Sequence, residues 1–224
     1  MSVQTEGYTE AIAHLPQGAL LRIPAVTWED YEALLEEMGD AYHVRVSYNY
    51  GCLEIMSPLP EHEAFADILL MITREITRTL GIKLETRGSM TIRNVRQRQG
   101  VEPDVCFYVR HAERIIGKRR LDFSSDPPPD IVAEIDITNE SHAKFPIYAA
   151  LGVPEIWHYD GHTMSFYKLE ERSYEPTTHS LALPLLPSTV LAQWLEQSTL
   201  EGQDVTLDTV RAWVRTQPPQ HLNR

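Results

Sequence analysis

Apolar residues recur at helical spacing in two segments of the N-terminal half. In residues 61–80 they form one stripe, which consists of Phe65, Ile68, Leu69, Ile72, Ile76 and Leu80. Residues 28–38 show the same spacing between Thr27 and Gly39, which are residue types favoured at the start and just past the end of a helix. The pattern therefore predicts two amphipathic helices whose apolar faces belong to the core.

Short runs rich in β-branched and aromatic residues predict strands elsewhere in the chain. The runs 44–48 and 52–56 flank a turn that contains Gly51, and the runs 155–159 and 164–168 flank an Asp-Gly turn. Each of these two pairs predicts a hairpin. Further strands are expected around residues 83–85, 90–92, 105–109 and 131–137.

Helix signals return after the last of these strands. Pro146 and Gly152 mark the first turn and the end of a short helix, and the patterning from 188 through 217 is also helical. We therefore predict an α/β (α+β) fold in which a mixed central sheet is flanked by helices. The length suits a single domain, residues 1–224, with a helical C-terminal extension at about 188–217.

Composition argues against a membrane protein. Hydrophobic residues make up 42% of the chain, but no apolar run reaches the eighteen residues of a spanning helix, and no signal-type segment follows Met1. We therefore expect a cytoplasmic protein without a membrane partner. Cys52 and Cys106 lack the C-x-x-C spacing of a zinc or redox site, so both are expected to be free thiols in the core.

The charge is unevenly distributed along the chain. A net charge of −12 opposes nucleic-acid binding, because such binding depends on Lys and Arg that neutralise phosphates. Between residues 87 and 120, however, nine Lys and Arg stand against three Asp and Glu. This stretch is either a solvated surface or a phosphate-facing patch. The candidate nucleic-acid contacts are Arg93, Arg96, Arg98, Lys118, Arg119 and Arg120.

Two predicted strands carry carboxylates within apolar runs, EPDVCFYV at 102–109 and PDIVAEIDI at 129–137. Burying a carboxylate is costly unless a cation or hydrogen bonds offset the cost. Strand alternation places Glu134 and Asp136 on one face, opposite an apolar core face. If the strands are neighbours, Asp104 and Glu134 converge on one divalent cation, Mg²⁺ or Mn²⁺. The alternative is that these acids pair with nearby arginines.

Lys144 lies ten residues after Glu134, at the start of the predicted short helix. The helix dipole disfavours a cation there, so the position is favourable only if the lysine faces carboxylates or an anionic substrate. Such a lysine stabilises charge that develops on phosphoryl oxygens. The alternative is a solvent-exposed lysine. His158 and His162 flank the second predicted turn and are expected on the surface, since they lack the helical i, i+4 spacing of a zinc-binding pair.

Several of these runs together resemble the bacterial Uma-two family of predicted restriction endonucleases, whose members are similar to the PD-(D/E)xK nucleases. The resemblance covers roughly residues 28–167 and rests on MSP at 56–58, His62, EPDVCF at 102–107, PPDIVAE at 128–134, KFPIYAALGVPEIW at 144–157 and Asp160. It implies a restriction-endonuclease-like core, a divalent metal, a nucleic-acid partner, most simply DNA, and a homodimer.

The resemblance also implies roles for particular residues. Asp104 and Glu134 bind the metal, Lys144 is the displaced catalytic lysine, and His62 lies near the mouth of the site. A capping or packing histidine is the alternative for His62. The standard pattern places lysine two residues after Glu134, where this chain has Asp136. Asp136 then becomes a further carboxylate that assists the metal.

The leading hypothesis is a metal-dependent endonuclease that hydrolyses phosphodiester bonds. A catalytically inactive nuclease-fold protein that acts as a dimeric binding or scaffold module is the second hypothesis. A metal-dependent hydrolase of another phosphorylated or carbonyl substrate is the third. Convergence of Asp104, Glu134 and Lys144 in space favours the first, whereas an Asp136 paired with arginine and a Lys144 pointing away favour the second.

Overall fold

A computed structural model describes residues 3–39, 43–137 and 141–218. The two ends of the predicted domain, residues 1–2 and 219–224, lie outside the described residues. The helical elements are α1 (Val3–Ala13), α2 (Trp28–Met38), α3 (Pro60–Leu80), α4 (Ala112–Ile115), the 3₁₀ turn η1 (His142–Lys144), α5 (Phe145–Leu151), α6 (Ser188–Glu201) and α7 (Gln203–Thr216).

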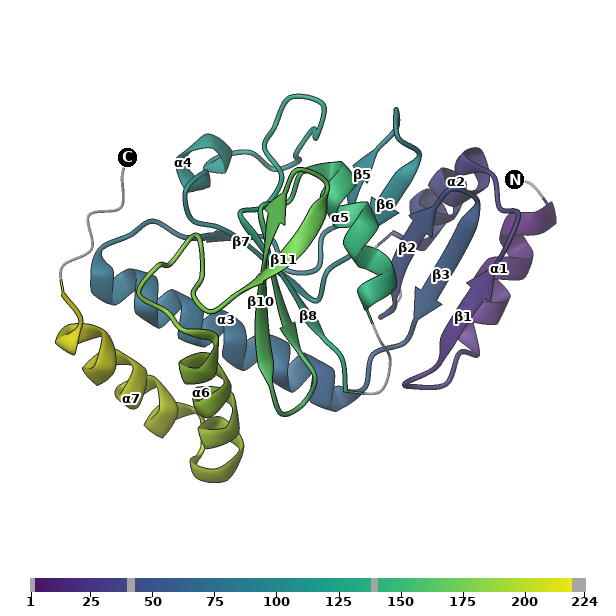
Figure 1. Ribbon diagram of the computed structural model, residues 1–224. Helices are drawn as coiled ribbons and strands as arrows, with labels where there is room; N and C mark the ends of the chain where they lie inside the picture. Colours follow the sequence, from purple (N-terminus) through teal and green to yellow (C-terminus); the bar gives the residue numbers. More distant parts are fainter. Residues whose placement is uncertain (1–2, 40–42, 138–140, 219–224) are drawn as a thin grey trace.

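The strands form two sheets (Figure 1). The first is antiparallel, in the order β1-β3-β2-β6-β5, and the second is mixed, in the order β11-β10-β9-β8-β7-β4, with β8 and β9 parallel. The strands of the first sheet are β1 (Leu20–Ile23), β2 (Arg45–Asn49), β3 (Cys52–Met56), β5 (Ile92–Asn94) and β6 (Gln99–Val101). Those of the second are β4 (Glu85–Thr86), β7 (Val105–Tyr108), β8 (Ile131–Ile135), β9 (Glu155–Tyr159), β10 (Met164–Glu170) and β11 (Ser173–Thr177).

The mixed sheet and its flanking helices confirm the predicted fold class. The apolar stripe of α3 packs against the face of β8 that carries Ile131, Ala133 and Ile135. Helices α6 and α7 complete this core through Trp194 and Val210, among others. The C-terminal helices therefore belong to the same apolar cluster as the mixed sheet.

The other face of the mixed sheet is also buried, which corrects the expectation of a polar face on β8. Val132 and Cys106 pack there against Ile147 and Tyr148 of α5. Glu134 lies on this face and is only 1% exposed. The short helix α5 covers the face, so any charge on it is shielded from solvent.

The first sheet was predicted only in part. The β2–β3 hairpin is confirmed, and its turn residues Tyr50 and Gly51 both have positive φ, as a two-residue turn of type I′ requires. Helices α1 and α2 cover this sheet, with Tyr31 and Leu34 fully buried. The chain crosses from β6 of this sheet to β7 of the mixed sheet through residues 102–104. The EPD motif therefore lies at the junction of the two sheets.

The structure also bears on the two cysteines and on the possibility of a membrane-spanning helix. Cys52 and Cys106 are free thiols, and Cys106 is buried whereas Cys52 is partly exposed. Across the described ranges, no helix is both long enough and apolar enough to cross a bilayer.

Candidate active site

The pairing of β7 with β8 brings the two predicted metal-binding carboxylates to one place. The strands are antiparallel, with Val105 opposite Ala133, so the next position places Asp104 beside Glu134. The backbone N–H of Asp104 donates to the carbonyl of Ala133 (3.1 Å), and Asp104 Oδ2 accepts the N–H of Ile135 (2.8 Å). The two acidic strands are therefore neighbours, and Asp104 is held rigidly at their end.

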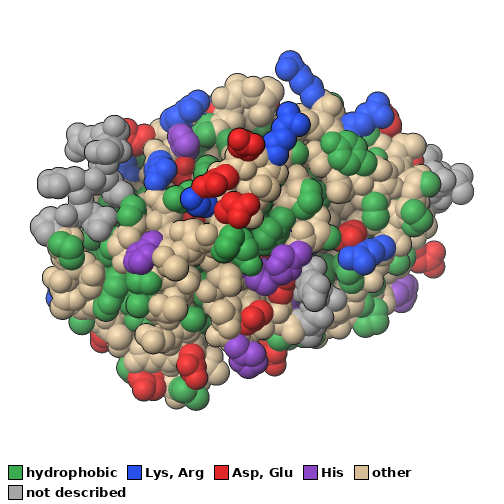
Figure 2. All heavy atoms as spheres, in the orientation of Figure 1, with side chains coloured by type: hydrophobic (Ala, Val, Ile, Leu, Met, Phe, Trp, Pro, Cys, Tyr) green, Lys and Arg blue, Asp and Glu red, His purple; other side chains and the backbone are tan. Residues whose placement is uncertain are grey.

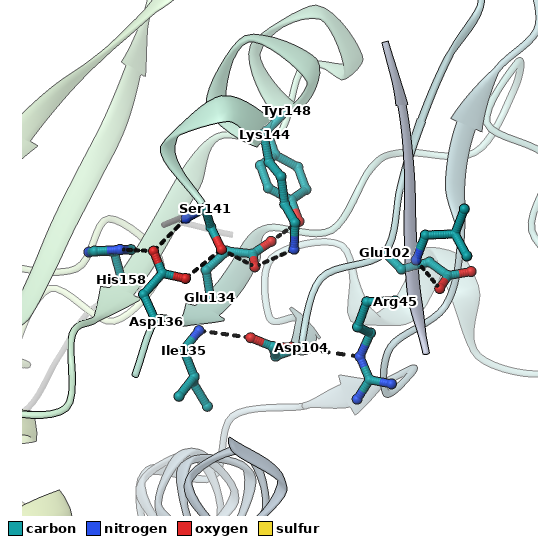
Figure 3. Close-up of polar contacts among 11 residues, drawn as sticks. Arg45, Glu102, Asp104, Glu134, Ile135, Asp136, Ser141, Lys144, Tyr148 and His158 are labelled. Atoms are coloured by element: carbon teal, nitrogen blue, oxygen red, sulfur yellow. Dashed lines mark hydrogen bonds and ion pairs between the residues drawn. The ribbon is translucent and has the colours of Figure 1, made fainter. Parts of the chain in front are cut away.

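Lys144 reaches the same place from η1 (Figure 3). Its Nζ lies 2.7 Å from Glu134 Oε2, and the residue is 8% exposed, so the alternative of a solvent-exposed lysine is wrong. One helical turn later, the Tyr148 hydroxyl donates to Glu134 Oε1. Lys144, the last residue of η1, and Tyr148 of α5 are four positions apart, so both side chains reach Glu134, and both of its carboxylate oxygens accept hydrogen bonds.

The charges of this cluster are strongly coupled. Burial raises the pKa of Glu134 to about 7; the Lys144 ammonium opposes this rise, and the charge of Asp104 adds to it. Burial alone would lower the pKa of Lys144, but the carboxylates of Glu134 and Asp104 outweigh it and raise the value. Lys144 is therefore a protonated, buried cation that faces two acids.

Asp136 forms a second network beside the first. Its Oδ2 accepts the N–H of Ser141 (2.5 Å) and contacts His158 Nε2 (2.6 Å), while its Oδ1 accepts the Ser141 hydroxyl (2.5 Å). Ser141 Oγ also lies 3.0 Å from Glu134 Oε2, so this serine joins the two networks. Asp136 thus pairs with a histidine and a serine, and the arginine pairing that would favour the binding-module hypothesis does not occur among the described residues.

His158 is buried, which corrects the expectation that it lies on the surface. It is on β9, which pairs in parallel with β8 and places it opposite Glu134. Burial would lower the pKa of His158, but its hydrogen bond to Asp136 raises it instead. His162, in the turn after β9, is exposed as predicted.

A small cavity opens on the Asp104 side of the site. Its volume is about 150 Å³, and its lining includes Arg45, Glu63, Asp67 and Asp104. Arg45 comes from β2 of the other sheet; its Nε lies 3.6 Å from Asp104 Oδ1 and its guanidinium donates to Glu63 (2.8 Å). Glu134 and Lys144 are not among the lining residues. Asp104 therefore stands between the cavity and the buried Glu134–Lys144 pair.

A larger groove of about 1260 Å³ adjoins this cavity, since both are lined by Arg45, Gly88 and Ser89. Three predicted nucleic-acid contacts also line it, namely Arg93, Arg119 and Arg120. The other three, Arg96, Arg98 and Lys118, are exposed but do not line it. Figure 2 shows basic side chains dispersed among acidic and apolar ones on the face in view. The basic stretch is thus split between the groove and the outer surface.

Three other residues of the predicted motifs lie outside these networks. His62 is 2% exposed, and neither ring nitrogen has a hydrogen-bond partner in the described part of the chain. Glu102 accepts the N–H of Val46 (3.0 Å) and the hydroxyl of Thr91 (2.5 Å), so it ties the first sheet together. Glu155 is fully buried, and its Oε1 accepts the indole N–H of Trp157 (2.7 Å). Glu102 and Glu155 therefore have structural roles.

The donor set fits a hard divalent cation. Asp104 and Glu134 supply carboxylate oxygens, the ligands that Mg²⁺ and similar ions prefer. Asp104 lines the cavity, and the 3.6 Å between its Oδ1 and Arg45 Nε is longer than a hydrogen bond. A cation bound there would lower the pKa of Glu134, which burial and, to a smaller extent, the charge of Asp104 hold high.

Sequence reasoning did not identify Tyr148, Ser141 and Arg45 as site residues. Tyr148 lies four residues after Lys144, so helical periodicity could have placed it on the same face. Ser141 and Arg45 carry no such signal. Arg45 reaches Asp104 only because a different sheet abuts the mixed one at the EPD junction.

Comparison with known proteins agrees with this description. The sequence profile of Uma2, a family described as "Putative restriction endonuclease", matches residues 28–201. No curated protein matches the sequence. A crystal structure from Anabaena variabilis, described as a "putative nuclease belonging to DUF820", is 16% identical over 76% of this chain and 99% of its own, with a TM-score of 0.53. The structural likeness shows a shared fold, and the profile match shows that the chain belongs to the Uma2 family.

Proposed function

We propose that this protein is a divalent-metal-dependent endonuclease of the PD-(D/E)xK type. One observation carries the proposal: Lys144 Nζ lies 2.7 Å from Glu134, although the two residues are ten positions apart and Asp136 occupies the usual lysine position. Two carboxylates and a lysine, the residue types of that catalytic set, therefore lie together in space although the standard spacing is absent. Family membership and the shared fold of a nuclease-like protein support the same function.

Asp104 and Glu134 would hold the cation, Mg²⁺ or Mn²⁺, which when bound neutralises phosphate charge and activates water. Lys144 supplies a fixed positive charge for the oxygens of the phosphoryl group as negative charge develops on them. Tyr148 and Ser141 hold the Glu134 carboxylate in place by hydrogen bonds. Burial of the Lys144–Glu134 pair strengthens these electrostatic effects, because the local dielectric constant is low.

The groove beside Asp104 is the proposed path of the nucleic acid. Its arginines include Arg93, Arg119 and Arg120, and it continues to the cavity at Asp104. We take DNA as the substrate and extend the proposal to a homodimer. A twofold pair of chains would present one active site to each strand of a duplex.

A silent binding module is the second candidate, and one observation favours it. Both oxygens of Glu134 already accept hydrogen bonds, from Lys144 and Tyr148, and Glu134 does not line the cavity. A cation that binds Glu134 must therefore displace Lys144 or Tyr148 from the carboxylate, or bind the same oxygens alongside them. A chain that cannot do so would bind nucleic acid through the groove without cutting it.

Cleavage of supercoiled plasmid with Mg²⁺ or Mn²⁺ tests the proposal. We expect metal-dependent cleavage that Asp104→Asn lowers by about a hundredfold or more, because the cation that stabilises charge on the phosphate loses one of its two carboxylate ligands. Asp67→Asn is the matched control, since Asp67 lines the same cavity but does not belong to the proposed metal site. Calorimetry with Mn²⁺ should show weaker binding in the first variant alone. Plasmid binding without cleavage under either metal would support the silent module instead.

The groove makes a separate prediction about affinity. Replacing both Arg119 and Arg120 by serine should weaken duplex binding. It should also reduce the magnitude of the slope of log K against log salt concentration by about 2, as expected when two phosphate contacts are lost. The control, Arg96→Ser with Lys118→Ser, removes the same charge outside the groove. Fluorescence anisotropy at several salt concentrations measures both. Equal losses in the two variants would show that charge alone, and not the groove, governs binding.

A further inference from the structure

We propose that Asp136, His142 and His158 form a binding site for a transition-metal ion, most simply Zn²⁺, that is separate from the Asp104–Glu134 pair. One ligand atom from each of the three residues lies within 4.8 Å of the other two. The residues come from three elements, since Asp136 follows β8, His142 begins η1 and His158 is on β9. An ion bound here would cross-link all three.

The histidine rings have a spacing suited to one shared ion. The ring centres of His142 and His158 are 4.8 Å apart. Two imidazoles on one tetrahedral Zn²⁺, with Zn–N distances of about 2.0–2.1 Å, hold their ring centres roughly 5 Å apart. The ring centres therefore need little displacement for both rings to bind the same ion.

The carboxylate also needs only a small adjustment. His158 Nε2 and Asp136 Oδ2 are 2.6 Å apart, in a hydrogen bond. Two ligand atoms of a tetrahedral Zn²⁺ site lie roughly 3.3 Å apart. An ion that replaces the shared proton would therefore move these two ligand atoms apart by less than about 1 Å.

The donor types distinguish this site from the carboxylate pair. Two imidazole nitrogens with one carboxylate oxygen suit Zn²⁺ and neighbouring transition ions, whereas Mg²⁺ prefers oxygen donors. Ser141 already orients Asp136 through its N–H and its hydroxyl, as outer partners of metal ligands do. His142 is exposed and gives the ion access from solvent, while Asp136 and His158 are more buried.

The position of His142 gives the site a consequence for the rest of the molecule. His142 is two residues before Lys144 in η1, and Ser141 hydrogen-bonds both Asp136 and Glu134. An ion at this site would therefore fix η1, and with it Lys144, against β8 and β9. Because the ion binds the folded chain, it should also raise the thermal unfolding temperature.

Zn²⁺ titration of the full chain tests the proposal. Calorimetry should detect one Zn²⁺ per chain in the presence of millimolar Mg²⁺, and Co²⁺ in its place should give visible absorption bands with the intensity of a four-coordinate site. His142→Ala should weaken Zn²⁺ binding by at least about tenfold, the loss seen when even an outer partner of a ligand is changed. His142 is exposed, so this variant is expected to keep the fold.

Two control variants make the test specific. His162→Ala removes an exposed histidine from the nearby turn and should leave Zn²⁺ binding unchanged. Asp104→Asn alters the carboxylate pair and should also retain this ion, so the result does not depend on nuclease activity. Absence of Zn²⁺ binding in the parent protein, or equal binding in His142→Ala, would overturn the site. Loss of binding in Asp104→Asn would instead assign the ion to the carboxylate pair.

Discussion

Replacing Lys144 by methionine is expected to lower metal-dependent cleavage by about a hundredfold or more, the usual effect of removing one preorganised charge that stabilises a transition state. Methionine is unbranched like lysine and one atom shorter, and it carries no charge. Lys144 is protonated and lies 2.7 Å from Glu134 in a buried site, so no solvent cation replaces it readily. The initial rate of plasmid nicking at saturating metal is the measurement.

Lys144→Arg separates the charge from the shape of the side chain. Arginine retains the positive charge but is a planar group, so we expect partial activity, above that of the methionine variant. Circular dichroism must show that both variants are folded at the assay temperature, because Lys144 is part of a buried pair. Unchanged cleavage by folded Lys144→Met would mean that this lysine has no part in the chemistry.

The elements that the sequence predicted best are those stabilised by local patterns. The long helix α3 has an apolar stripe on one face and is ended by Gly81 in the left-handed conformation. The β2–β3 hairpin depends on its own turn. By contrast, β6 is the short run Gln99–Val101, which has no alternation to detect, and it is a strand only because β2 and β5 lie on either side of it. The first sheet as a whole is a product of such distant pairings.

The candidate site was predictable to a similar extent. Burial of carboxylates in apolar strands indicated Asp104 and Glu134, and the cost of a cation at a helix start indicated that Lys144 faces them. His158 was misplaced because a hairpin turn normally lies in solvent. Its side chain instead faces Asp136, since the parallel pairing of β8 and β9 places both residues on one face of the sheet. The order of strands in a sheet depends on contacts between residues far apart in the sequence, so the local spacing of residue types does not predict it.

The buried pair itself should dominate the stability of this region. Lys144→Met leaves Glu134 without its cation in a fully buried position, and breaking a buried ion pair in this way costs up to about 3–5 kcal/mol at a pH where the carboxyl would be ionised. Adding Glu134→Gln should recover most of this loss, because the variant pair then carries no charge. A double-mutant cycle measured by urea unfolding, with chelator present, gives the coupling between the two residues.

The dependence on pH provides an independent check of the same pair. The pKa of Glu134 is already raised to about 7 by burial, and without the Lys144 ammonium it should rise further. A carboxyl group whose pKa is higher in the folded state stabilises the fold below its unfolded pKa and loses that contribution as pH rises through the folded value. The deficit of Lys144→Met should therefore be small near pH 5 and grow toward pH 8. The double variant lacks the titrating carboxyl, so its free energy of unfolding should depend less on pH over this range than that of Lys144→Met. A deficit independent of pH in Lys144→Met would show that lost packing, and not an uncompensated charge, is the cause.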